Sequence, residues 1–196
     1  MLNIALTGGI ACGKSLVGQY LAKRGVPVCE TDEIGHDVLD QDEIVRAAVV
    51  GAFGEAVSEP DGRINRPALG RMVFSDARKR ERLNALTHPA ILERTAEWVA
   101  TQRRTHDDVV VIIPLLFEIG AEHDWDKVIC VAAPLADQMK RLAARGLTAD
   151  EALARIQAQM GLTLKSERAD YVIYNCGDES LLEEQTQHLW RKIRGV

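Results

Sequence analysis

The sequence predicts an α/β protein built on a five-stranded parallel sheet, with helices on both faces and two helical insertions. Two observations lead to this fold class. Short runs of β-branched and apolar residues alternate with amphipathic helical patterns, which is typical of a parallel sheet that is covered on both sides. The first of these runs passes directly into a glycine-rich loop that precedes a helix. The expected strands are Leu2–Leu6, Val26–Glu30, Val109–Ile113, Lys127–Ala132 and Tyr171–Tyr174.

The first helix and the first insertion follow from the spacing of apolar and punctuating residues. Lys14–Arg24 places its apolar residues on one face, and Gly25 suits the C-cap of that helix. The segment Asp42–Arg104 contains no convincing strand. We expect it to form several helices around a turn rich in Pro, Asp and Gly, with Pro67 and Pro89 each in the first turn of a helix.

The second insertion is expected at residues 136–168. A helix over Ala136–Arg145 ends before a glycine, and a capping box of Thr148 and Glu151 begins another helix. That second helix is expected to stop near Gly161. We expect both insertions to be lobes of one domain, whose core is formed by residues 1–41, 105–135 and 169–196.

Composition excludes several classes of protein. An apolar content of 46% and a charged content of 27% are ordinary for a globular chain, and a net charge of −5 argues against a general nucleic-acid binder. Four scattered cysteines without a CxxC pair favour a reducing compartment over a metal finger. No signal peptide is evident, and the run Val109–Phe117 is shorter than the roughly 20 residues that span a bilayer. We expect a cytoplasmic protein with no membrane segment and no obligate protein partner.

The glycine-rich loop fits the pattern GxxxxGK[ST] over Gly8–Ser15. In this pattern successive main-chain N–H groups and the start of a helix form a concave site for phosphates. The lysine reaches the β- and γ-phosphates and the hydroxyl binds Mg²⁺, so the phosphates of a nucleotide and Mg²⁺ are the expected ligands of this P-loop. The alternative is a glycine-rich turn without a ligand. The residues assigned to the nucleotide are Gly8, Gly9, Ala11, Cys12, Gly13, Lys14, Ser15 and Leu16, with Ser15 as the metal ligand.

Several segments identify the kind of nucleotide protein. The NKxD motif of switch GTPases and the signature stretch of adenylate kinases are absent. The chain resembles the dephospho-CoA kinase family, in order, over essentially its whole length. The segments that carry the resemblance are LTGGIACGKS, VCETDEIGHDVL, INRPALGRMVFSDARKRERLNALTHPAI, IIPLLFEIG, QMKRLAARGLTADEALARIQAQM and KSERADYVIYN.

Three positions depart from the family pattern. Cys12 stands where members usually have Ser, Leu16 where they have Thr, and Asn65 where they often have an acidic residue. None of these changes removes a group that the chemistry requires. The Cys12 thiol, close to a helix start, is either reactive or a small apolar filler.

The resemblance implies transfer of the ATP γ-phosphoryl group to the ribose 3′-hydroxyl of dephospho-CoA, with Lys14 holding the transferring group. It makes Asp32 the general base, which also contacts the acceptor. The alternative is that Thr31 or Asp32 is the N-cap of a helix over Glu33–Leu39. Because no aspartate ends the third strand at Ile112–Pro114, Asp32 is also a candidate to serve Mg²⁺.

The resemblance also assigns the basic second insertion to a lid. Arg141 and Arg145 lie on one helix face, with Gln138 nearby. They either face solvent or neutralise charge on the nucleotide, and the resemblance favours the lid, with Arg141 catalytic and Arg145 binding the nucleotide. Lys165 and Arg168 are candidates to join them. By resemblance Asn175 lies next to the adenine.

For the acceptor, the resemblance indicates Arg66, His88 and the four residues Leu115, Leu116, Phe117 and Glu118. His88 before Pro89 is alternatively a packed residue at a helix start, and the apolar residues are alternatively core. The remaining histidines, at positions 36, 106, 123 and 188, show no ligand spacing. A non-catalytic nucleotide-binding module, or a kinase for another small hydroxyl acceptor, is the alternative function.

Overall fold

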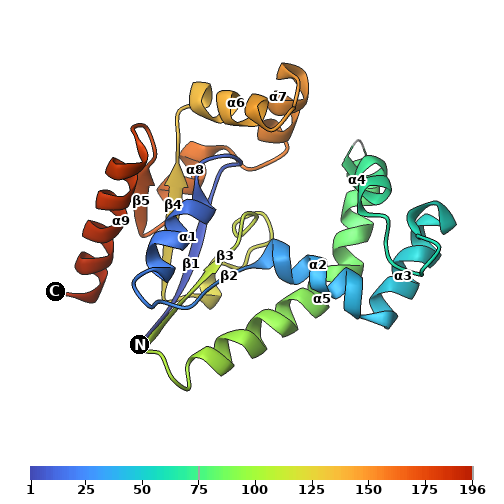
Figure 1. Ribbon diagram of the computed structural model, residues 1–196, viewed down its shortest axis with the longest axis horizontal. Helices are drawn as coiled ribbons and strands as arrows, with labels where there is room; N and C mark the ends of the chain where they lie inside the picture. Colours follow the sequence, from blue (N-terminus) through green and yellow to red (C-terminus); the bar gives the residue numbers. More distant parts are fainter. Residues whose placement is uncertain (75, 196) are drawn as a thin grey trace. The chain divides into compact units, whose positions relative to one another are not determined.

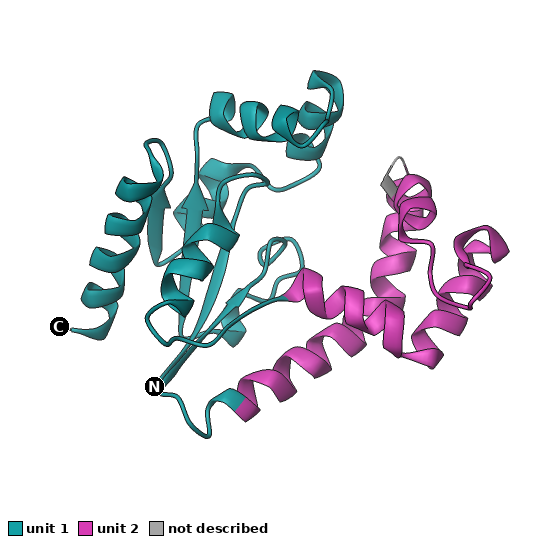
Figure 2. Ribbon diagram, viewed as in Figure 1, with its two compact units in different colours: residues 1–30, 102–196 teal, residues 31–101 magenta. Residues whose placement is uncertain are grey.

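The computed structural model describes residues 1–74 and 76–195, which form two compact units (Figure 2). Unit 1 comprises Met1–Glu30 and the chain from Gln102 onwards, and unit 2 comprises Thr31–Thr101. The chain therefore leaves the sheet for unit 2 after its second strand and returns before its third. The sequence pattern had assigned residues 31–41 to the sheet core, whereas these residues lie in unit 2.

Unit 1 contains the five-stranded parallel sheet that the sequence predicts, in the order β2-β3-β1-β4-β5 (Figure 1). The three central strands are largely buried on both faces, as expected for a covered parallel sheet, whereas the two edge strands are partly exposed. β1 is central, and its Leu6 is aligned with Ile112 of β3 on one side and Ile129 of β4 on the other. The strands are β1 (Leu2–Gly8), β2 (Val28–Glu30), β3 (Asp108–Ile112), β4 (Lys127–Ala132) and β5 (Tyr171–Tyr174).

Helices cover both faces of this sheet, and the alternation of side chains along β4 shows how. Ile129 and Val131 enter an apolar core with residues of α1 and α9, while Cys130 contacts Ser166 of α8 at 3.8 Å. Since successive residues of a strand point to opposite faces, α8 lies on the face opposite α1 and α9. The helices of unit 1 are α1 (Lys14–Ala22), η2 (Glu122–Asp124), α6 (Leu135–Ala144), α7 (Ala149–Gln157), α8 (Leu162–Arg168) and α9 (Glu179–Arg194).

The ends of two of these helices can be compared with the sequence signals. α1 ends at Ala22 with Lys23 as its C-cap residue, so the expected C-cap at Gly25 is two residues too late. Gly25 closes the turn that follows, with a φ of 81° and an N–H that donates to the Ala22 carbonyl at 2.9 Å. The capping box of Thr148 and Glu151 is present at the start of α7. The chain then forms α8, with Gly161 as its N-cap residue, which the sequence did not predict.

Unit 2 is helical and has its own apolar core. Its centre is formed by valines from three consecutive elements, Val38, Val49 and Val57. The turn after η1 carries an isolated antiparallel bridge between Ser58 and Ile64. The helices of unit 2 are α2 (Thr31–Gln41), α3 (Glu43–Phe53), η1 (Glu55–Val57), α4 (Arg66–Phe74) and α5 (Ala77–Gln102).

The expectation that Pro89 begins a helix is wrong, because Pro89 lies inside α5. Pro67, by contrast, lies in the first turn of α4 as predicted. A proline within a helix lacks one N–H and crowds the preceding turn, so helices bend there. Figure 1 shows α5 changing direction along its length. Leu86 and Ile91, on either side of Pro89, both pack against the unit 2 core, and this packing offsets the local cost.

No helix within residues 1–74 and 76–195 has the length and apolarity needed to cross a membrane.

Candidate functional site

The glycine-rich loop between β1 and α1 has a backbone that only glycine permits at two points. Gly8 and Gly13 have φ values of 142° and 102°. A Cβ at Gly8 would collide with the Val131 carbonyl, and one at Gly13 would collide with the Asn175 amide. Gly13 is the N-cap residue of α1 and has no side chain over the helix start. Because no side chain caps the start of α1, the first N–H groups of this helix are available to an anion, which the helix dipole also attracts.

The two reactive side chains of the motif occupy the first turn of α1. Lys14 Nζ donates to the carbonyls of Gly8 and Gly9 at 3.1 and 2.9 Å, so its ammonium group lies over the loop. Ser15 is exposed beside it. Leu16, which was assigned to the nucleotide, packs against the apolar core of unit 1.

Asn175, the residue directly after β5, holds the phosphate loop by a hydrogen bond. Its side chain is only 6% exposed and donates from Nδ2 to the Cys12 carbonyl at 2.9 Å. The Cys12 side chain is fully buried, and burial raises the pKa of its thiol. Cys12 is thus a small buried filler, which resolves the alternative that the sequence left open.

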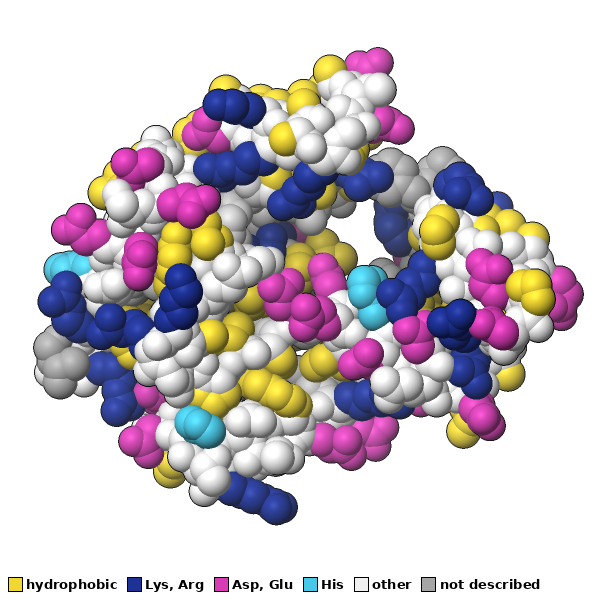
Figure 3. All heavy atoms as spheres, in the orientation of Figure 1, with side chains coloured by type: hydrophobic (Ala, Val, Ile, Leu, Met, Phe, Trp, Pro, Cys, Tyr) yellow, Lys and Arg dark blue, Asp and Glu magenta, His cyan; other side chains and the backbone are white. Residues whose placement is uncertain are grey.

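The second insertion contacts the same loop. Arg141, on α6, donates from Nη1 to the Ala11 carbonyl at 3.0 Å. Ala11 itself has a φ of 57°, an uncommon conformation for a residue with a Cβ. Arg145 is exposed at the C-cap of α6. Figure 3 shows Lys and Arg side chains gathered over α6 and α7.

Two glutamines of the second insertion also approach the loop. Gln159, just after α7, accepts a hydrogen bond at 2.9 Å from the Ile10 N–H. Gln138 is buried, and its amide donates to the Ala133 carbonyl at 3.0 Å. The sequence pattern gave no role to Gln159. Its only signal was a polar residue directly after an amphipathic helix, which is common on protein surfaces.

The loop after β3 was predicted to bind the acceptor, but most of its side chains pack or form hydrogen bonds within unit 1. Leu116 and Phe117 are buried, and the Arg168 guanidinium stacks on the Phe117 ring at 4.9 Å. These side chains offer no surface to a ligand in this arrangement, as in the alternative that they are core. Leu115 is half-buried. Glu118 accepts a hydrogen bond at 2.8 Å from the ammonium group of Lys165.

Asp32 lies in the first turn of α2, at the start of unit 2. It is exposed, and the helix begins one residue earlier, at Thr31. Both residues are therefore inside the helix, so the alternative that one of them is the N-cap is wrong. A carboxylate in a first turn is favoured by the helix dipole.

Arg66 and His88 lie on separate helices of unit 2. Arg66, at the start of α4, forms an ion pair with Asp40 of α2. Both side chains line a pocket of about 440 Å³, together with Arg63 and Asn65. Asn65 caps α4, since its Oδ1 accepts from the Ala68 N–H at 2.9 Å.

His88 is half-buried on α5, and burial lowers the pKa of its imidazole below the ordinary value of 6.5. At pH 7 this imidazole is therefore neutral, so it can form hydrogen bonds but supplies no positive charge. It lies well inside the helix, so the alternative that it sits at a helix start is wrong.

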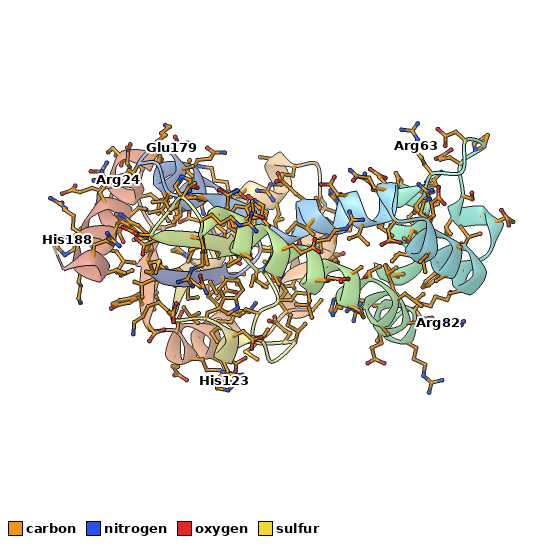
Figure 4. All side chains as sticks on the ribbon, turned by 90° about the horizontal axis from the view of Figure 1, so that it is seen from below. Arg24, Arg63, Arg82, His123, Glu179 and His188 are labelled. Carbon is orange, nitrogen blue, oxygen red and sulfur yellow. The ribbon has the colours of Figure 1, made fainter. Side chains whose placement is uncertain are left out.

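Histidine is a common metal ligand, but the remaining histidines among the described residues are not part of a separate metal cluster. Figure 4 shows His123 and His188 on the outside of unit 1, and Arg63 on the outer turn of unit 2. Within the described part of the chain, no three His, Cys, Asp or Glu side chains gather closely enough to hold a metal ion.

A family model described as dephospho-CoA kinase matches residues 2–180. The chain belongs to the dephospho-CoA kinase family. As a member of this family it is a kinase, a transferase that uses ATP as a substrate, and its place is in coenzyme A synthesis. The family match covers both units, so it includes the phosphate loop and the helical unit 2 alike.

Individual relatives agree with the dephospho-CoA kinase family. Dephospho-CoA kinase of Shouchella clausii is 42% identical over 178 residues, which cover 90% of each chain. Among solved structures, dephospho-CoA kinase from Campylobacter jejuni has a TM-score of 0.74 and 27% identity, and 97% of this chain and 96% of that one are covered. A shikimate kinase from Acinetobacter baumannii, with a TM-score of 0.61 and 14% identity over 100% of this chain and 94% of its own, shares only the fold.

Proposed function

We propose that this chain transfers the γ-phosphoryl group of ATP to the ribose 3′-hydroxyl of dephospho-CoA, giving CoA and ADP. The observation that carries the proposal is a complete phosphate loop, with Lys14 over its carbonyls, in a chain of the dephospho-CoA kinase family. The hydroxyl oxygen forms a bond to the γ-phosphorus, and the bond to the bridging oxygen breaks. ADP leaves with that electron pair, and the hydroxyl proton passes to a carboxylate.

The nucleotide half of the reaction belongs to unit 1. The loop amides and Lys14 hold the β- and γ-phosphates and offset the charge that builds up on the leaving group. Arg141 adds a positive charge at the loop, where it already contacts the Ala11 carbonyl. Asn175 keeps the loop in shape through the Cys12 carbonyl.

Mg²⁺ fits this loop. Mg²⁺ keeps most of its waters and binds through one or two protein groups plus substrate phosphates, so the exposed Ser15 hydroxyl is a sufficient protein ligand. When bound, the ion neutralises charge on the phosphates. Asp32 is the candidate to assist it, because β3 ends at Ile112 without a carboxylate.

The acceptor half of the reaction belongs mainly to unit 2, which contains Asp32. We assign Asp32 as the general base that orients and deprotonates the 3′-hydroxyl. Arg66, with its guanidinium at the 440 Å³ pocket, is the candidate to bind the acceptor's diphosphate. His88, neutral at pH 7, would contact the acceptor by hydrogen bonding. Of the loop after β3, Leu115 and the main chain remain available to the acceptor.

The test is a coupled assay for ADP with dephospho-CoA and with adenosine, AMP, shikimate and gluconate as rival acceptors. We expect turnover with dephospho-CoA, and a decrease of about 10²–10⁴-fold in kcat for Asp32→Asn, the usual contribution of a general base. Asp37→Asn, an exposed aspartate on the same helix, is the matched control and should retain full activity.

Each other outcome has a definite meaning. Activity confined to a rival acceptor would make the chain a kinase for another hydroxyl compound. ATP binding without turnover of any acceptor would make it a nucleotide-binding module. If Asp32→Asn retained wild-type kcat, Asp32 would not be the base.

A further inference from the structure

The connection between α7 and α8 is tied to two different parts of unit 1. Gln159 Oε1 accepts from the Ile10 N–H of the phosphate loop at 2.9 Å. The next residue, Met160, donates its N–H to Glu118 Oε1 at 2.8 Å. Two adjacent residues at the base of the lid thus join the phosphate loop to the loop after β3.

Glu118 is in turn held by a buried lysine. Lys165, on α8, is 0% exposed, and its Nζ lies 2.8 Å from both Glu118 Oε1 and the Pro114 carbonyl. A buried ammonium group without such partners is very costly, so this arrangement tolerates little movement. The Thr7 hydroxyl also donates to the Pro114 carbonyl, at 3.4 Å. Glu118 therefore presents its oxygen to Met160 from a fixed point on the sheet.

The phosphate loop receives two lid side chains at consecutive residues. Gln159 binds the N–H of Ile10, and Arg141 binds the carbonyl of Ala11. Ala11 has a φ of 57°, a conformation that a non-glycine residue keeps only where its surroundings enforce it. Gln159 holds the Gly9–Ile10 peptide group and Arg141 holds the Ala11–Cys12 peptide group, so the two side chains bracket Ala11 and define the curvature of the loop.

We propose that Gln159 is a positioning residue, which keeps the phosphate loop in the shape that receives the nucleotide, and that the Glu118–Lys165 pair holds Gln159 in place through Met160. Glu118 then acts on the nucleotide side of the reaction, by way of the lid, instead of touching the acceptor. The inference rests on the proposed function only in that the chain binds ATP.

The test is Gln159→Met, which preserves side-chain length and removes the acceptor oxygen. Gln157→Met, on the exposed last residue of α7, is the matched control. ATP binding is measured by calorimetry without any acceptor, and the KM values for ATP and dephospho-CoA are measured separately. Because one net hydrogen bond is lost, we expect the Kd and KM for ATP to rise about 5- to 10-fold in Gln159→Met. The KM for dephospho-CoA, the Tm and the control variant should be unchanged.

A double-mutant cycle tests the second half of the proposal. If Glu118 acts through Gln159, Glu118→Gln raises the Kd for ATP, and combining it with Gln159→Met adds little more. If Glu118→Gln fails to fold, Lys165→Met, which removes the ammonium partner of Glu118, takes its place in the cycle.

Three results would overturn the inference: a Kd for ATP within twofold of wild type in Gln159→Met, an equal rise in the KM for dephospho-CoA, or additive effects in the cycle. Failure of the proposed function looks different. It appears in the wild type, as absent ATP binding or as turnover with another acceptor, and the latter leaves the ATP measurement on Gln159 intact.

Discussion

Burial in the folded protein opposes the reactivity that the position of the Cys12 thiol suggests. A thiol next to a helix start and a lysine often has a lowered pKa. Here burial outweighs the nearby Lys14, and the pKa of Cys12 is raised from its ordinary value of 9.0. Burial likewise raises the pKa of Cys130 on β4. We therefore expect neither thiol to act as a nucleophile in the folded protein.

Alkylation with iodoacetamide at pH 8 should therefore distinguish the cysteines by burial. We expect Cys176, which is exposed, to react in the native protein, and Cys12 and Cys130 to react only after unfolding. Peptide mapping by mass spectrometry gives the order of modification, and the guanidinium-unfolded protein is the control. Modification of Cys12 at native conditions, at the rate of Cys176, would contradict this reading.

For single residues, the sequence predicted the local phosphate loop better than it predicted side-chain contacts between distant parts of the chain. The phosphate-loop residues follow from a local motif, because main-chain geometry there depends on neighbouring glycines. Gln159 could not be found in this way, since its partner Ile10 is distant in the chain and the link is a single hydrogen bond. The resemblance predicted that Glu118 binds the acceptor. Its ion pair with Lys165 was not predicted, because this tertiary contact is not encoded in any local sequence pattern.

Among elements, those with strong local signals were predicted well. β4 and β5 have the expected bounds, because each is an apolar run between polar turns. The capping box at Thr148 was also found. α8 and α9 were missed, and Pro89 was misplaced, because packing of α5 on the unit 2 core overrides a local helix breaker.

The capping box makes the stability of the first turn of α7 depend on pH. The Thr148 N–H donates to the Glu151 carboxylate at 2.8 Å and lowers the pKa of Glu151 below its ordinary value of 4.5. The ionised form is therefore favoured in the folded state. This contribution is complete above about pH 4.5, the unfolded pKa, and is lost as the pH falls through the lower folded value.

Amide exchange in the first turn of α7 measures this effect. After correction for intrinsic rates, we expect protection to be constant from pH 7 to about pH 5 and to decrease below about pH 4. Glu151→Gln retains a side chain suited to the box but cannot titrate, so its protection should not fall in that range. An identical decrease in this variant would assign the effect to another group.

On the scale of the whole molecule, the sheet and the helical insertions followed from the order of strands and helices, whereas the point of division did not. α2 joins unit 2 because Val38 is buried with Val45 and Val49 of α3. A helix directly after a strand is ordinarily assigned to the sheet, so only the three-dimensional core reveals its membership.

Ligands should therefore protect different units. The phosphate loop lies in unit 1, and the Arg66 pocket lies in unit 2. With ATP at 100 times its Kd, exchange at residues 8–15 should slow by up to about 100-fold, since a ligand stabilises the state that it binds. With dephospho-CoA alone, the slowing should centre on residues 59–67. Hydrogen exchange with mass spectrometry, with and without each ligand, gives the map, and protection of unit 1 alone by the acceptor would contradict the assignment.

The central place of β1 in the sheet has a consequence for biosynthesis. β1 pairs with β3 and β4, both of which follow unit 2 in the chain, and its loop is braced by Asn175, which lies 163 residues after its partner Cys12. A nascent chain that carries the whole glycine-rich motif consequently has no formed nucleotide pocket. We therefore expect ATP to be captured only after Asn175 has been translated, so a fragment that ends before Asn175 should be unable to retain the nucleotide.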